Sequence, residues 1–217
     1  FNQDCNEVEQ CGNGARCFYR FVKDKHLTEK KSIRVETKSG VIELTEDHER
    51  MIEVNMGEPI FNPNLIPFIS DSEKNEYPIL VDSENQKETI HIAVLSMGNP
   101  HAVLTVKDVN KADIEKLGPY IESHKLFPKR VNVGFMEIVS THHIRLRVFE
   151  RGVGETLACG TGACAAAVSG IKRQLLTSPV KVDMKGGSLS IDWKGPTYPV
   201  MMKGPAVMLY EGDIEIP

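Results

Sequence analysis

Two short segments of the sequence repeat one cysteine-glycine pattern. The first is Cys11-Gly-Asn-Gly-Ala15 and the second is Cys159-Gly-Thr-Gly-Ala163, so the two differ at a single position. An acidic stretch precedes each segment, and helix-forming residues follow it. The repeat predicts a duplicated unit in which each half places one cysteine at the start of a central helix.

A cysteine at a helix start is suited to proton transfer. The unpaired N–H groups of the first turn stabilise a thiolate, which predicts a pKa below about 8.5 for Cys11 and Cys159. The adjacent Gly12 and Gly160 let the backbone approach an anion such as a carboxylate. Two such turns that face each other would place a thiolate on one side of a substrate carbon and a thiol on the other. Removing a proton from one face and returning one to the other inverts the carbon centre.

Other uses of these cysteines fit the pattern less well. A lone cysteine is more often a small buried apolar residue, but core packing gives no reason for the same glycines to recur. Neither loop has the Lys-Ser/Thr of a phosphate-binding loop, and the spacings are too wide for a zinc knuckle. The cysteines are few and odd in number, which argues against a disulfide framework. We therefore predict free thiols at Cys5, Cys11, Cys17, Cys159 and Cys164. A thiol redox or binding protein is the alternative from another class.

Most of the remaining sequence has the pattern of short strands separated by turn residues. Apolar and charged residues alternate strictly in Ile144-Arg-Leu-Arg-Val148, which predicts an antiparallel strand with one exposed face. Three segments have the pattern of helices: 15–23, 111–124 at the surface, and 163–176, which is apolar nearly all round and therefore predicted to be buried inside a curved sheet. Strands are predicted at 32–37, 41–45, 51–56, 89–97, 102–106, 131–139, 144–150, 180–184, 188–193, 198–203 and 206–210.

The composition is that of an ordinary globular protein. The 217 residues include 26 Lys and Arg against 30 Asp and Glu, a formal net charge of −4, and 41% are hydrophobic. The sequence has no basic run, so we expect neither a nucleic acid nor a membrane surface as a partner. No apolar stretch is long enough to span a bilayer, and we expect a cytoplasmic protein.

Several longer motifs resemble the diaminopimelate epimerase family across nearly the whole chain. They are residues 1–18, Ser96-Met-Gly-Asn-Pro-His101, Arg130-Val-Asn-Val-Gly-Phe135, Arg147-Val-Phe-Glu-Arg-Gly152 and residues 158–166. The resemblance implies an α+β fold of two pseudo-symmetric lobes, each a curved, mostly antiparallel sheet around a central helix. It implies a homodimeric enzyme, without cofactor or metal, that interconverts LL- and meso-diaminopimelate in lysine and peptidoglycan biosynthesis. Proline racemase, hydroxyproline epimerase and a phenazine-synthesis isomerase are alternatives that keep the fold.

The resemblance also implies roles for individual residues. Cys11 and Cys159 are the two bases, assisted by His101 and Glu150. Tyr210 is a dimer contact. The groups implied to bind the substrate are Asn2, Asn99, Asn132, the helix starts Gly12-Asn13 and Gly160-Thr161, and the pair Glu150 and Arg151.

The expected domain division places residues 1–55 and 205–217 in the first lobe and 56–204 in the second. Closure over a substrate would then hinge near 55–59 and 204–205. In the family a further segment precedes the position of Phe1. We therefore expect an incomplete first lobe that either exposes apolar surface or is completed by a partner, and a protein that lacks full activity. Cys5 replaces a usual glycine, and we expect Cys17 and Cys164 to be buried.

Overall fold

The computed structural model describes residues 12–37, 40–83 and 86–213, which form an α+β fold. The helices are α1 (Gly12–Asp24), α2 (Ile114–Glu122) and α3 (Gly160–Lys172), with one 3-10 turn, η1 (Pro63–Leu65). The strands are β1 (Ser32–Thr37), β2 (Gly40–Glu46), β3 (Ile52–Asn55), β4 (Tyr77–Ser83), β5 (Gln86–Ser96), β6 (Pro100–Val106), β7 (Asn132–Ser140), β8 (His143–Glu150), β9 (Gly154–Thr156), β10 (Val180–Met184), β11 (Gly187–Asp192) and β12 (Met201–Gly204).

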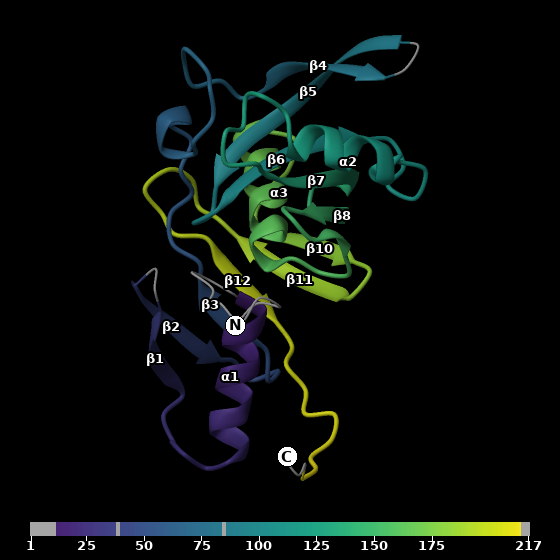
Figure 1. The fold of residues 1–217 in the computed structure, drawn as a ribbon. Coiled ribbons are helices and arrows are strands. Elements are labelled where there is room, and N and C mark those ends of the chain that lie inside the picture. The colour runs from purple at the N-terminus through teal and green to yellow at the C-terminus, as the bar shows by residue number, and fades with distance from the viewer. Residues whose placement is uncertain (1–11, 38–39, 84–85, 214–217) are drawn as a thin grey trace.

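One continuous sheet runs through the described residues in the order β1-β2-β3-β12-β11-β10-β8-β7-β6-β5-β4, and β9 pairs with β8 beside it. Neighbouring strands are antiparallel except at β6–β7 and β8–β10, which are parallel. The sheet passes between the two ends of the molecule where β3 pairs with β12. Figure 1 shows the larger part of the sheet curving around α3. The expected curved, mostly antiparallel sheet is confirmed.

Helix α3 lies in the middle of this curved part and contacts strands β5 to β8, β10 and β11. Residues 160–170 are all buried, as the apolar sequence predicts. The run Ala165-Ala-Ala167 leaves little side-chain bulk, so the strands can approach the helix axis closely. Helix α1 packs on β2 and β3, and its first residues contact α3.

Helix α2 covers the outer face of the sheet, where it packs on β7, β8 and β9 (Figure 1). A second apolar cluster lies beneath it and includes Ile114, Ile121 and Phe135. Gly118 is the point of close approach, because a Cβ at this position would lie 2.6 Å from Cγ of Phe149 and 3.0 Å from its Cβ.

Gly118→Ala is expected to lower the free energy of unfolding by about 1–3 kcal/mol, even though alanine is the better helix former. The clash involves Cβ of Phe149 as well as its ring, so relief requires the β8 backbone to shift. Gly212→Ala is the control, because a Cβ there meets nothing within 4 Å. Urea denaturation of the two variants measures the difference, and equal midpoints would contradict the prediction.

The strand predictions differ from the structure at three places. β4 is absent from the predicted strands. It contains Pro78, which an edge strand tolerates, and β4 is the last strand of the sheet. β9 is only three residues long. The strand predicted at 206–210 is wrong: these residues pair with no strand among those described, and the side chains of Val207, Leu209 and Tyr210 are exposed.

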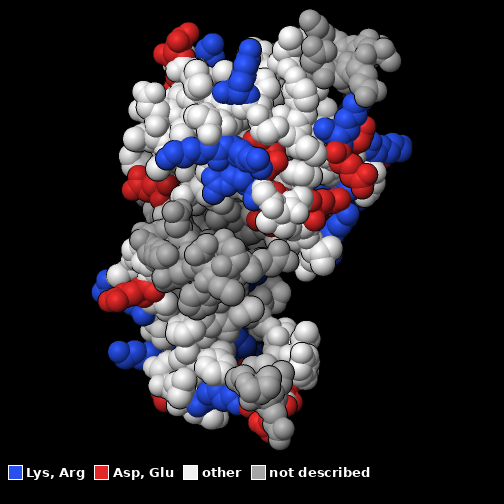
Figure 2. Space-filling view, viewed as in Figure 1, with Lys and Arg blue, Asp and Glu red and all other residues white. Residues whose placement is uncertain are grey.

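Charged side chains of both signs are interspersed over the described part of the face drawn in Figure 2. This distribution agrees with the nearly balanced count of acidic and basic residues. No helix among the described residues has the length and apolar character needed to cross a membrane.

Candidate active site

The starts of α1 and α3 converge on one side chain, Met202 of β12. A Cβ added to Gly12 would lie 2.3 Å from Cε of Met202, and one added to Gly160 would lie 3.2 Å from its Sδ. The side chain of Asn13 reaches the same place, with Oδ1 3.4 Å from the Cβ position of Gly160. The two repeated segments therefore meet, although they are far apart in the sequence.

The cysteines of the repeat precede these two glycines directly. Cys159 is described in full, whereas Cys11 lies outside the described residues, as do Asn2 and Cys5. Gly12, the first described residue after Cys11 in the sequence, lies next to the same methionine that Gly160 contacts.

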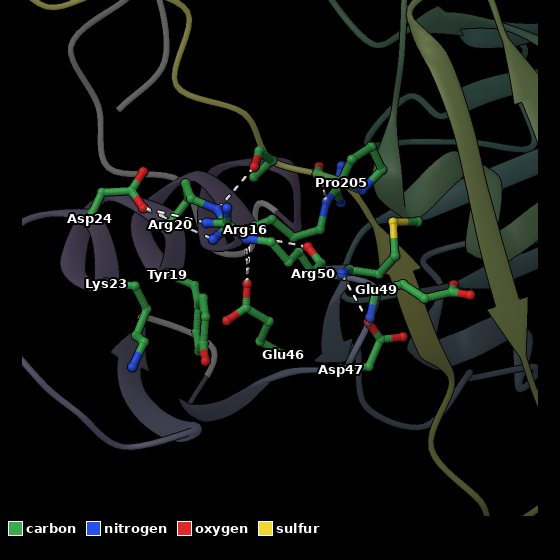
Figure 3. Close-up of polar contacts among 12 residues, drawn as sticks. Arg16, Tyr19, Arg20, Lys23, Asp24, Glu46, Asp47, Glu49, Arg50 and Pro205 are labelled. Atoms are coloured by element: carbon green, nitrogen blue, oxygen red, sulfur yellow. Dashed lines mark hydrogen bonds and ion pairs between the residues drawn. The ribbon is translucent and has the colours of Figure 1, made fainter.

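Arg16 holds the start of α1 in this position. It is buried, and its Nη1 donates to the carbonyl oxygen of Gly12 at 3.3 Å and lies 3.8 Å from Sδ of Met202. Its Nε donates to the carbonyl oxygen of Pro205 at 3.3 Å, just after β12 ends. One guanidinium thus joins the helix start to the chain that leaves β12 (Figure 3).

Arg20, one turn further along α1, anchors the next part of the same segment. Its Nε donates to the carbonyl oxygen of Ala206 at 3.0 Å, and its Nη2 lies 2.7 Å from Glu46 Oε1 and 3.0 Å from the carbonyl oxygen of Arg50. Figure 3 shows Arg20 with Glu46, Arg50 and Asp24 around it. These contacts hold residues 205–206 by side chains, without strand pairing.

Cys159 is the residue that begins α3. Its backbone is extended, with φ −135° and ψ 112°, and its carbonyl oxygen accepts from the N–H of Ala163 at 2.9 Å. Only 6% of the residue is exposed. Sγ lies 3.5 Å from the hydroxyl oxygen of Thr161, so the thiol is held inside the first turn as the repeat predicts.

The predicted lowering of the Cys159 pKa is wrong for this structure. Burial and the nearby Glu150 carboxylate raise the pKa of this thiol to about 12. The helix-start N–H of Gly162 and the hydroxyl of Thr161 do lower the pKa, but burial outweighs them because it removes the thiolate from water. Cys159 is therefore a neutral thiol at pH 7 in this structure.

Glu150 lies at the end of β8, where it can exchange a proton with Cys159. The two side chains are close enough for the carboxylate to raise the thiol pKa both through its charge and through a hydrogen bond. Glu150 Oε1 also accepts from the hydroxyl of Thr156 at 2.6 Å. Thr156 belongs to β9, so this short strand, which the sequence pattern did not predict, orients the carboxylate.

His101 contacts Asn99 in this structure. Its Nε2 lies 2.9 Å from Asn99 Oδ1, and an amide oxygen can only accept, so Nε2 carries the proton. His101 is 1% exposed, and burial together with the charge of Arg151 lowers its pKa to about 3. The described contacts thus make His101 a neutral residue that orients an asparagine.

His101→Gln is expected to reduce the acid sensitivity of folding. The unfolded state takes up a proton at His101 below pH 6.5 while the folded state stays neutral down to about pH 3, so stability is full above pH 6.5 and falls as the pH drops. Between pH 8 and pH 5 the loss from this residue is about 2 kcal/mol. Urea denaturation followed by Trp193 fluorescence should show that loss in the parent and in the His26→Gln control. An equal loss in His101→Gln would contradict the assignment.

Asn132 joins the strands that carry the other site residues. It is 4% exposed, its Nδ2 donates to the carbonyl oxygen of Pro100 at 3.1 Å, and its Oδ1 accepts from the N–H of Arg151 at 3.0 Å. These contacts connect the start of β6 with the turn after β8. Both polar groups of the Asn132 amide thus bind backbone in this structure, and the expected contact with the substrate stays a prediction.

A cavity of about 210 Å³ lies beside this junction. Two of the predicted substrate-binding residues, Asn99 and Arg151, line it together. The Arg151 guanidinium donates to the carbonyl oxygen of Lys129 at 3.2 Å, and Lys129 also lines the cavity. Amide groups and cationic side chains suit a ligand that carries carboxylate. The remaining lining residues include Leu65, Ile66, Ser96 and Pro100.

Cys164, Cys17 and Tyr210 differ in how far they are buried. Cys164 is buried within α3, as predicted, and burial raises the pKa of its thiol. Cys17 was expected to be buried but is exposed, because it lies outside the set of α1 residues that face the sheet, which are Gly12, Arg16, Tyr19 and Arg20. Tyr210 is 85% exposed.

Sequence reasoning did not find Met202, Thr156 or Lys129. Met202 is one of several methionines in apolar strands, and only the meeting of the two helix starts distinguishes it. Among the described residues, no three His, Cys, Asp or Glu side chains are grouped so that they could hold a metal ion.

Relatives with assigned names match this chain over its whole length. A diaminopimelate epimerase of an Azoarcus species is 56% identical over 217 residues, which cover 100% of this chain and 77% of the relative. The diaminopimelate epimerase of Pseudomonas aeruginosa is 55% identical over 216 residues, again with 100% and 77% covered.

Solved structures with low sequence identity share the fold. A phenazine biosynthesis protein of Bacillus anthracis superposes with a TM-score of 0.65 at 18% identity, covering 96% of this chain and 77% of the other. A probable proline racemase of Agrobacterium radiobacter gives a TM-score of 0.66 at 15% identity, with 93% and 68% covered. A family model described as diaminopimelate epimerase matches residues 1–62 and 93–209. The chain belongs to the diaminopimelate epimerase family.

Proposed function

We propose that this protein interconverts LL- and meso-diaminopimelate with Cys11 and Cys159 as the two proton-transfer groups. The observation that carries the proposal is the convergence of the two cysteine-bearing helix starts on Met202. The thiolate of one cysteine removes the α-proton and becomes a thiol. The thiol of the other cysteine gives its proton to the opposite face of the carbon and becomes a thiolate, so the proton count is unchanged.

The state of Cys159 supports its role as the group that donates a proton. The thiol is neutral at pH 7 and sits beside the Glu150 carboxylate, which can accept its proton in the reverse direction. A substrate carboxylate placed at the helix start replaces water there, and the N–H groups of the first turn then stabilise the charge that develops on the substrate. The helix starts Gly12-Asn13 and Gly160-Thr161 would hold this α-carboxylate and its amino group.

Asn13 supports a binding site between the helix starts. Its Oδ1 is buried and has no hydrogen-bond partner among the described residues. Leaving a buried acceptor without a donor costs about 1–3 kcal/mol, and a substrate ammonium group would supply the donor. Asn99 and Arg151, at the cavity, would bind the second amino-acid end of the substrate.

The larger organisation follows the same proposal. Residues 1–55 and 205–217 would form one lobe and 56–204 the other, and the pairing of β3 with β12 would then join the two lobes. Closure about 55–59 and 204–205 would exclude water from the thiols.

We also propose a cytoplasmic homodimer whose subunits contact each other through Tyr210. The enzyme would serve lysine and peptidoglycan biosynthesis. Sedimentation of the parent and Tyr210→Ala proteins tests the dimer.

Exchange of the substrate hydrogen with solvent tests the reaction. Purified protein is incubated with LL-diaminopimelate in deuterium oxide, and mass spectrometry should show one deuterium gained with formation of the meso isomer. L-proline, offered in parallel, should gain none, because it has no second amino-acid end for Asn99 and Arg151. Deuteration of proline without deuteration of diaminopimelate would overturn the proposed substrate.

A further inference from the structure

A buried carboxylate stands close to the proposed substrate site without belonging to it. Glu122, the last residue of α2, is 7% exposed and is the one acidic residue buried among those the structure describes. Removing a carboxylate from water is costly unless hydrogen bonds or opposite charges compensate. The hydrogen-bond partners of Glu122 therefore indicate its role.

Glu122 binds the turn that carries Arg151. Its Oε1 accepts from the N–H of Gly152 at 2.7 Å, a short hydrogen bond to a charged acceptor. Gly152 has φ +74°, a conformation that favours glycine, and the turn closes with the N–H of Val153 donating to the carbonyl oxygen of Glu150 at 3.0 Å. The carboxylate thus fixes a turn whose conformation is already restricted.

Glu122 also binds the segment that follows Lys129. Nη1 of Arg130 lies 3.5 Å from Glu122 Oε1, and the N–H of Val131 donates to the carbonyl oxygen of Glu122 at 3.2 Å. Lys129, the neighbour of Arg130, lines the cavity, and its carbonyl oxygen accepts from the Arg151 guanidinium. Glu122 therefore binds both segments from which the cationic wall is built.

Three successive contacts thus restrain Arg151. The backbone N–H of Arg151 is held by Asn132, the next N–H along the chain is held by Glu122, and the guanidinium is held by Lys129. Only the contact with Glu122 comes from outside the sheet and its connecting loops. The packing of Gly118 against Phe149 brings α2 close enough to the sheet for this contact.

We propose that Glu122 is a positioning residue that holds Arg151 in the orientation needed to bind the far carboxylate of the substrate. The proposal rests on the proposed function for the identity of that ligand, but the restraint itself is independent of it. Glu122 touches no reacting atom, so its loss should weaken substrate binding and leave proton transfer largely intact.

Amide hydrogen exchange tests the restraint without reference to activity. In Glu122→Ala, the amides of Arg151 and Gly152 should exchange roughly tenfold faster than in the parent, because the turn loses a charge-assisted hydrogen bond. Glu122→Gln keeps an acceptor oxygen of the same reach and should recover most of the protection. Glu115→Ala removes an exposed carboxylate from the same helix and should leave both amides unchanged.

Kinetics on the same proteins tests the purpose of the restraint. Glu122→Ala should raise KM for diaminopimelate roughly tenfold with kcat nearly unchanged. In an Arg151→Met background the same substitution should change KM little further, because no guanidinium is left to position. Parental exchange in Glu122→Ala would overturn the restraint, and faster exchange with an unchanged KM would overturn its role in binding. A parent protein that turns over no diaminopimelate would count against the proposed function alone, since amide exchange still decides the restraint.

Discussion

Replacing Cys159 by serine should lower the rate of epimerisation by roughly a thousandfold, with little change in KM. Proton transfer by a positioned group contributes about 10²- to 10⁴-fold, and a serine hydroxyl is a far weaker acid than a thiol. The buried position increases the effect, because no water can replace the missing proton donor next to Glu150. Steady-state epimerisation of both isomers, measured as meso and LL product, gives kcat and KM.

Two other cysteines provide matched controls for that substitution. Cys17→Ser removes an exposed thiol from α1, and Cys164→Ala removes a buried one from α3 itself. Both should retain the parental kcat. Cys11→Ser should lose activity as fully as Cys159→Ser, since each direction of the reaction needs one base and one acid. Solvent exchange that survives both serine substitutions would exclude the two-thiol mechanism.

Replacing Arg151 by methionine should raise KM for diaminopimelate roughly a hundredfold and change kcat much less. Arg151 lines the cavity with Asn99, and a charge-assisted pair between a guanidinium and a carboxylate is among the stronger polar contacts in proteins. Methionine keeps much of the length of the side chain and removes the charge. Arg145→Met, on the exposed face of β8, is the matched control and should bind as the parent does.

Lysine distinguishes loss of a carboxylate contact from general damage to the site. It is diaminopimelate without the second carboxylate, so its inhibition constant should be the same for the parent and Arg151→Met. A parallel weakening of lysine and diaminopimelate would show that Arg151 does not bind the far carboxylate.

The features predictable from sequence were those set by local pattern. The uniform apolar character of α3 predicts burial on every side, and the alternation in β8 predicts its buried and exposed faces. The repeat around Cys11 and Cys159 predicts helix starts because glycine and cysteine recur there at fixed spacing. Each of these properties depends on residues that are neighbours in the sequence.

The features that sequence reasoning missed depend on distant contacts. The pKa of Cys159 follows from burial and from Glu150, which comes from another element, and burial outweighs the helix start that sequence alone can show. The backbone role of Asn132 requires β6, β7 and β8 to be in register. The failed strand at 206–210 has a strand-like composition, but strand formation needs a partner, and Arg16 and Arg20 bind this segment instead.

Met202 limits how independently the two halves of the site can change. Both glycines that follow the cysteines contact this one flexible side chain, so enlarging it to narrow one helix start would crowd the other. Conversely, shortening Met202 to admit a bulkier amino acid at one helix start would also open the other helix start. Because both helix starts contact one thioether side chain, a substitution at Met202 changes the space at both halves of the site together.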